Sequence, residues 1–151
     1  MITNRTQSDV EQAILLIETK VKKFIELSEE ELDILERGTL TISTLNRIES
    51  KQQQLKELIN GIGYWSINIQ NKSWTYSDIF NENELPRIIE NIKNLKDGFF
   101  VYSYTPQIPD AKYYFSNIND MEKILCDLEN MVEDIKNNYR ECGAVETGED
   151  L

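Results

Sequence analysis

The chain has 151 residues, a net charge of −11 at neutral pH and 40% hydrophobic residues, values typical of one soluble domain with a sizeable core. Its longest apolar run covers only residues 13–17, far short of the ~20 residues that a membrane-spanning helix requires, and no secretory leader is visible. We therefore expect a protein made in the cytoplasm, without membrane insertion. The acidic charge disfavours nucleic-acid binding, because an acidic surface repels the phosphate backbone.

Residues with catalytic or metal-binding chemistry are scarce. Histidine is absent, and Cys126 and Cys142 are the only cysteines. Clustered Cys and His ligands for zinc and histidine-dependent nucleophile sets are therefore missing. In one continuous helix the two cysteines would lie ~24 Å apart, too far for a disulfide. We expect a protein that is not an enzyme, with no catalytic residue, no cofactor and no metal.

Apolar spacings of three and four residues predict three helices in the first 60 residues. The first covers 7–26 and begins at the capping residue Thr6. The second is short, 28–38, and begins with a capping box at Ser28. The third covers 43–60.

The stretch after the third helix changes its period. Residues 64–76 alternate apolar and polar side chains, and this spacing predicts a small β-hairpin. A fourth helix is expected over 83–97, capped by Asn83 and ended by Gly98. In the third helix, Gln52 occupies a position where the pattern expects an apolar residue.

Residues 99–115 hold seven of the chain's 14 aromatic side chains around Pro106 and Pro109, which predicts an extended segment with a rigid turn. Two interpretations stay open. The rings cover the open end of a helical bundle, or they stack on the sugar rings of a carbohydrate ligand. The candidate interaction residues in this segment are Tyr102, Tyr104, Tyr113 and Tyr114.

The last helix, 116–140, is the element around which the chain is organised. Its apolar residues alternate three and four apart in one unbroken stripe, so Leu125, Leu128 and Val132 are expected to be buried. Gly143 is placed to end the helix. The acidic residues lie off the stripe and are expected to face water: Asp120, Glu122, Asp127, Glu129, Glu133 and Asp134.

These patterns predict one mainly α domain over 1–142, a bundle of four main helices plus one short helix, followed by an acidic tail, 143–151. Heptads in the first and last helices predict a homo-oligomer. The tail is short, polar and acidic, so we expect it to be flexible in the isolated protein.

Spaced patches over nearly the whole chain carry a resemblance: 2–10 (ITNRTQSDV), 45–49 (LNRIE), Trp74 with 78–79 (DI), 91–95 (NIKNL), 105–106 (TP) with Pro109, 119–125 (NDMEKIL), and Gly143 with 147–149 (TGE). In these patches the chain resembles a group of small proteins from phages and prophages of low-GC Gram-positive bacteria. It departs from them just before the final glycine, where that group tends to have aromatic residues and this chain has Glu141 and Cys142.

The resemblance implies a structural component of a phage tail or baseplate, or of a phage-tail-like particle, located in the virion or particle and bound to other tail or baseplate proteins. It implies a role in the particle, but no catalytic residue and no mechanism. The alternative is a carbohydrate-binding adhesion module of the tail tip that uses 99–115. A third interpretation is a regulatory protein that acts through helix contacts.

The recurring Gly and Thr-Gly-Glu pattern that the resemblance places in the tail implies that this segment becomes ordered against a neighbouring subunit. Gly143 and Gly148 would then allow close backbone approach, and Glu149 would meet a basic group. A tail that only solubilises the protein is the alternative.

Overall fold

The structure, a computed structural model, describes residues 1–64, 67–81 and 83–147, with side chains described as far as residue 138. All regular secondary structure in these ranges is helical, which confirms the mainly α prediction. The elements in chain order are α1 (Gln7–Thr19), the 3₁₀ turn η1 (Val21–Lys23), α2 (Glu29–Gly38), α3 (Ile42–Gly61), α4 (Glu84–Asp97) and α5 (Phe115–Thr147).

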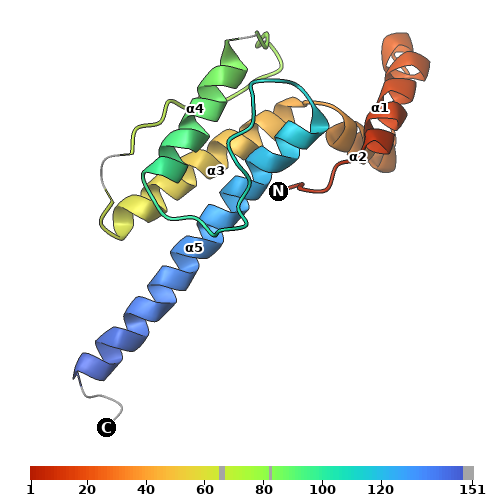
Figure 1. Ribbon diagram of the computed structural model, residues 1–151. Helices are drawn as coiled ribbons and strands as arrows, with labels where there is room; N and C mark the ends of the chain where they lie inside the picture. The colour runs from red at the N-terminus through yellow and green to blue at the C-terminus, as the bar shows by residue number, and fades with distance from the viewer. Residues whose placement is uncertain (65–66, 82, 148–151) are drawn as a thin grey trace.

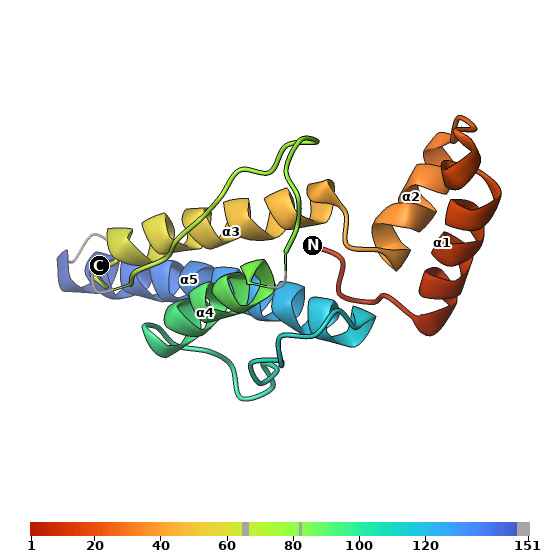
Figure 2. The same ribbon diagram turned by 90° about the horizontal axis from the view of Figure 1, so that it is seen from above.

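The helices are arranged in two parts. Helices α3, α4 and α5 lie side by side as a three-helix bundle (Figure 1). Helices α1 and α2 pair with each other as an antiparallel hairpin that stands at one end of the bundle, and α5 runs out beyond the bundle at the opposite end (Figure 2). We call the hairpin, residues 7–38, the arm. Only Ala13 is buried in α1 and no residue is buried in α2, so the arm lacks a core of its own.

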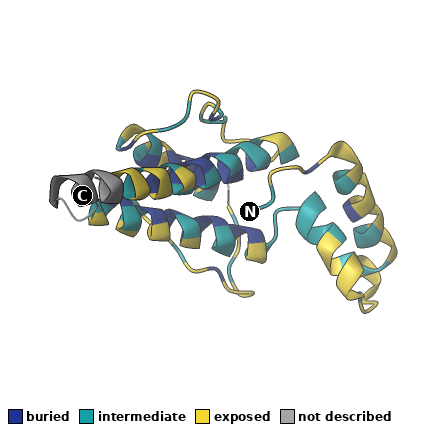
Figure 3. Ribbon diagram, turned by 90° about the horizontal axis from the view of Figure 1, so that it is seen from below, coloured by how far each residue is buried: buried dark blue, intermediate teal, exposed yellow. Residues whose placement is uncertain are grey.

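The hydrophobic core lies between α3, α4 and α5, where the buried positions of the three helices face one another (Figure 3). Leu125, Leu128 and Val132 are fully buried, as predicted from the heptad pattern of α5. Ile67 and Trp74 add to this core from the connection between α3 and α4. The facing residues of α3 and α4 are Leu45, Ile48, Leu55, Ile59, Leu85, Ile88, Ile92 and Leu95.

The first helix ends earlier than predicted. Helix α1 stops at Thr19, and η1 leads to Phe24, whose left-handed backbone conformation (φ 54°) helps to reverse the chain. A helix continuing to residue 26 would carry the chain away from the start of α1, so α2 could not pack back along it. The range 7–26 is therefore wrong at its C-terminal end. The predicted caps at Thr6 and Ser28 are present. The predicted cap at Asn83 is wrong, because the backbone of Asn83 is already helical and its side chain makes no capping hydrogen bond.

Helices α1 and α2 pack closely at Gly38. A Cβ atom at this position would lie 2.2 Å from the carbonyl oxygen of Asp9 and 2.4 Å from the Cβ of Ala13, so a side chain would force the helices apart. We expect Gly38→Ala to lower the free energy of unfolding by ~1–3 kcal/mol, measured by urea denaturation. Gly61→Ala is the control, because a Cβ there meets nothing within 4 Å. Equal losses in the two variants would contradict the close packing.

The connection between α3 and α4 is not the predicted β-hairpin. Residues 67–76 form no strand, and residues 65–66 lie outside the described ranges. Backbone N–H groups of this connection donate to side chains of α3 and α4, which satisfy the donors that a partner strand would otherwise bind. The donors and their acceptors are Gln70 with Asn91, Lys72 with Glu49, and Trp74 with Asn46, at 2.7–2.9 Å.

Helix α5 continues past its predicted end. The sequence places a helix stop at Gly143, but the helix runs through this residue to Thr147. A glycine inside a helix costs ~1 kcal/mol relative to alanine, a small penalty within a helix of 33 residues. The segment predicted to be a tail from residue 143 is therefore helical as far as residue 147. Residues 148–151 lie outside the described ranges.

Candidate functional site

The predicted aromatic residues form two separate groups, of which Tyr102 and Tyr104 are the first. Their rings stack, with centroids 5.0 Å apart and an interplanar angle of 7°. The Tyr102 hydroxyl donates to the carboxylate of Asp134 on α5, and this charged acceptor raises the pKa of Tyr102 to about 12. The ammonium group of Lys123 lies 5.4 Å from the centroid of the Tyr104 ring. Contacts within the chain therefore already cover part of the Tyr102 ring and part of the Tyr104 ring.

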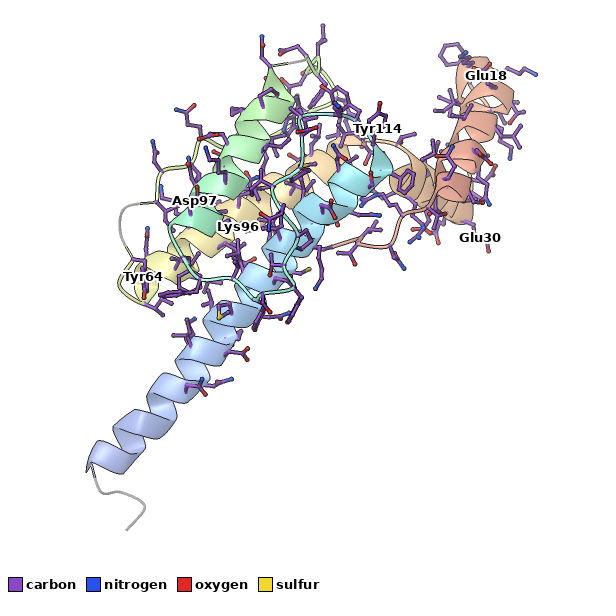
Figure 4. The ribbon with its side chains drawn as sticks, in the orientation of Figure 1. Glu18, Glu30, Tyr64, Lys96, Asp97 and Tyr114 are labelled. Atoms are coloured by element: carbon purple, nitrogen blue, oxygen red, sulfur yellow. The ribbon has the colours of Figure 1, made fainter. Side chains whose placement is uncertain are left out.

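Tyr113 and Tyr114 form the second group, beside the start of α5 (Figure 4). Tyr113 packs edge-on against Phe80 with ring centroids 5.4 Å apart, whereas Tyr114 is 62% exposed. With the two residues before them, these tyrosines line an open hollow of about 510 Å³. Asp134, which binds Tyr102, lies ~28 Å along α5 from the start of that helix. The structure therefore does not bring the four tyrosines into one site.

The segment that carries Tyr102 and Tyr104 is fixed to the helices by polar contacts. The Thr105 hydroxyl donates to Asp127 at 2.9 Å, and the Lys123 ammonium pairs with the same carboxylate at 2.5 Å. Asp127 is only 1% exposed, so the prediction that this carboxylate faces water is wrong. The Asp127 carboxylate is buried in part because Thr105, which is itself buried, lies against it and donates a hydrogen bond to it.

Gly148 and Glu149, the two candidates in the acidic tail, lie outside the described residues. The docking of this tail against a neighbouring subunit stays a prediction.

Glu122 connects three parts of the chain in a buried ion-pair network. Its Oε1 atom lies 3.0 Å from the guanidinium group of Arg5 and 2.6 Å from that of Arg47 on α3. The backbone N–H of Ile2 also donates to this carboxylate. The side chains of Glu122 and Arg5 are fully buried, so the prediction that Glu122 faces water is also wrong. No local pattern predicts this burial, because the compensating arginines lie 117 and 75 residues away in the chain.

The network continues from Arg47 to the arm. A second nitrogen of the Arg47 guanidinium lies 2.6 Å from Glu36 on α2, which also accepts hydrogen bonds from the hydroxyls of Thr41 and Thr44. Burial acts to raise the pKa of Glu36, but the three donors outweigh it and hold the pKa of this carboxyl below its ordinary value of 4.5. The arm is thus attached to the bundle through Glu36, Arg47 and Glu122.

The lowered pKa of Glu36 makes the stability of this attachment depend on pH. A carboxyl with a depressed folded-state pKa stabilises the fold above its unfolded-state pKa, and this contribution is lost as the pH falls through the folded-state pKa. We expect Glu36→Gln to lose on the order of 1–2 kcal/mol at pH 7 and to show a smaller further loss between pH 5 and pH 3 than the parent protein. Urea titrations at each pH measure this, with Glu26→Gln as the exposed control. Parallel pH profiles for the parent and Glu36→Gln would contradict the assignment.

A third buried acid, Glu49 on α3, holds the connection between α3 and α4. It accepts a hydrogen bond from the indole N–H of Trp74 at 3.3 Å and pairs with the guanidinium group of Arg87 on α4. An open, polar hollow of about 470 Å³ lies beside it. Within the described ranges, no group of three or more His, Cys, Asp or Glu side chains is arranged to hold a metal ion. No helix in those ranges combines the length and apolar character needed to cross a membrane.

Large apolar side chains are exposed along the arm, an arrangement that the sequence pattern did not reveal. The three-and-four spacing of α1 predicts an apolar stripe, but it does not show whether the bundle covers that stripe. In a soluble protein, a contiguous exposed apolar surface marks an interaction site. The exposed residues, with their exposed fractions, are Phe24 (98%), Leu15 (63%), Leu32 (54%), Ile14 (53%), Ile25 (49%) and Val21 (40%).

No protein-family model, curated protein or solved structure matches this chain at a significant level. A function for the chain therefore has to be inferred from its surfaces and from the resemblance carried by its sequence patches.

Proposed function

We propose that this chain is a non-enzymatic structural component of a phage tail or baseplate, or of a phage-tail-like particle, and that it acts through protein–protein contacts. Its partners in the particle are other tail or baseplate proteins and further copies of itself. The observation that carries the proposal is the arm, a two-helix projection at one end of a packed bundle (Figure 2), whose large apolar side chains are left uncovered.

The division of the chain into bundle and arm suits an assembly role. The bundle buries a hydrophobic core within the chain. The arm exposes apolar surface whose removal from water would favour association. Because the Glu36–Arg47–Glu122 network attaches the arm to the bundle, a partner bound to the arm would be held in a defined orientation.

The phage setting comes from the sequence resemblance, and three of its patches meet in the buried network. Arg5 comes from the patch 2–10, Arg47 from the patch 45–49, and Glu122 from the patch 119–125. The side chain of Asn119 adds two hydrogen bonds of 3.0 Å to the backbone of Arg5. The patches that carry the resemblance therefore include residues that connect distant parts of this fold, which supports a resemblance over the whole chain.

Particle composition tests the proposal. Particles purified from the strain that carries the gene should contain the chain in a fixed ratio to the major tail proteins, as measured by quantitative mass spectrometry. Deletion of the gene should yield incomplete tails in negative-stain electron micrographs, and the intact gene supplied in trans should restore them. Normal particles from the deletion strain, together with a chain that stays in the soluble fraction, would refute the proposal.

One observation favours the carbohydrate-binding alternative: the Tyr114 ring is exposed beside an open hollow. An aromatic ring with an open face can pack against a sugar. A glycan array separates the two functions, since a purely structural component should bind no saccharide. Saccharide binding that disappears in Tyr114→Ala and persists in Tyr76→Ala, a variant of another exposed tyrosine, would favour the adhesion module.

A further inference from the structure

The apolar residues of the arm can be placed on one side of the hairpin from its contact lines. Ala13 and Gly38 mark where α1 and α2 touch. Ile14 follows Ala13 by one residue and Leu32 precedes Gly38 by six, so each is turned about 100–120° in the same sense from the contact line of its helix. In an antiparallel pair, the same sense of rotation means the same side. By the same geometry, Leu15 is turned about 200° from the contact line, so it lies on the back of α1, away from α2.

The tip of the arm adds further exposed apolar side chains. The ion pair between Lys20 and Glu31, at 2.6 Å, brings the turn at the end of α1 next to the first turns of α2. The tip between these helices carries Val21, Phe24 and Ile25, all exposed. We define the arm face as Ile14, Val21, Phe24, Ile25 and Leu32.

The exposed ring of Phe24 at the tip is not explained by packing within the chain. Its backbone is left-handed, a conformation that is unfavourable for a bulky side chain and suits glycine or asparagine. Its ring is 98% exposed, so packing within the chain gives no compensation. Residues held in such conformations cluster at sites of function. An aromatic ring presented in this way is suited to be buried by a partner.

We infer that the arm face is the interface of a two-fold symmetric dimer of this chain, in which the arms of two copies pack face to face into a four-helix bundle. The inference rests on the proposed function, which counts further copies of the chain among its partners, and names the surface and the symmetry of that contact. Two antiparallel hairpins with apolar faces complete a four-helix bundle when they pack together. A two-fold axis is the commonest symmetry of homo-oligomers.

The exposed area agrees with this occupant. At ~150–250 Å² for a large side chain, the exposed fractions of the five residues amount to roughly 500 Å² of apolar surface. A stable dimer buries about 800 Å² on each partner, including a polar rim around its apolar centre. The arm face therefore supplies the centre of such an interface, and the charged residues around it supply the rim.

The charges at the tip favour a second copy as the partner. Lys23, Glu29 and Glu30 form no salt bridge with any side chain that the structure describes, although they lie on the same turn and on the helix start that follows it. A two-fold axis near the tip would place Lys23 of each copy near the acidic residues of the other. The tip thus complements itself, whereas a partner of uniform charge would meet both signs.

Sedimentation velocity of the purified full-length chain, from 1 to 300 μM, tests the inference. The parent chain should form dimers, and Phe24→Asn and Ile14→Ser should each weaken dimerisation at least tenfold. Asparagine removes the ring and accepts the left-handed backbone, so Phe24→Asn should keep the parent circular dichroism spectrum. Leu15→Ser removes an apolar side chain that is about as exposed as Ile14 but lies on the back of α1, outside the arm face, and should leave the dimer intact.

A charge reversal identifies the partner. Lys23→Glu should weaken dimerisation, and Lys23→Glu combined with Glu30→Lys in the same chain should restore it, because the two-fold axis brings the two positions together. A monomeric parent at 300 μM would overturn the inference, and so would an equal loss of dimer in Leu15→Ser and Phe24→Asn. Either result would leave the particle-composition test of the proposed function unaffected.

Discussion

Replacement of Glu122 by alanine is expected to lower the free energy of unfolding by about 3–5 kcal/mol. The variant leaves the guanidinium group of Arg5 buried without its only carboxylate partner in the described part of the chain, and removes one of the two carboxylates that bind Arg47. An isolated buried charge costs far more than a lost surface ion pair, because its solvation is not replaced. Urea denaturation of the purified protein at pH 7 measures the loss.

Glu129→Ala provides the matched control on the same helix. Glu129 pairs with Lys51 at 2.9 Å, but both side chains remain partly exposed, so the variant should lose no more than about 1 kcal/mol. Similar losses in Glu122→Ala and Glu129→Ala would show that the network around Glu122 is open to water.

Leu128→Ala is expected to cost about 2–5 kcal/mol through the cavity that it leaves. Leu128 is fully buried at the centre of the α5 stripe, where α3, α4 and α5 meet. The control is Leu15→Ala, the same substitution at a position that is 63% exposed, with an expected change below about 1 kcal/mol. A loss below about 1 kcal/mol for Leu128→Ala would contradict the central position of α5.

Local rules were sufficient to predict the helices and the main core. The stripe of α5 places Leu128 in the core because a three-and-four spacing on a long helix marks one face unambiguously. The caps at Thr6 and Ser28 were also predictable from local sequence, because a capping box depends on residues only three positions apart. Each of these predictions depends on neighbours within one or two helical turns.

Long-range polar pairing could not be predicted. Glu122 and Asp127 lie off the apolar stripe of α5, a position that is normally exposed to water. Both are buried because residues from distant parts of the chain bind them: Arg5 and Arg47 bind Glu122, and Thr105 binds Asp127. The same applies to residues 67–76, where side chains of α3 and α4 satisfy the backbone and replace the expected hairpin. A periodic pattern contains no information about such partners.

The arm shows a different limit. The apolar stripe of α1 was visible in the sequence, but a stripe is equally compatible with the core of one chain and with an interface between chains. The early end of α1 at Thr19 and the turn at Phe24 let α2 pack along α1, so the stripe of α1 contacts α2 and not the bundle. The candidate tyrosines, chosen for their density in the sequence, are instead divided between two surfaces.

We propose that the arm is the surface through which this chain assembles. Amide hydrogen exchange with mass spectrometry, on the full chain at 2 μM and at 300 μM, tests this role of the arm. Peptides within 10–35 should gain protection at the higher concentration, while peptides of α4 and of the buried part of α5 should exchange equally at both. Unchanged exchange in the arm, or new protection confined to α4 and α5, would contradict it.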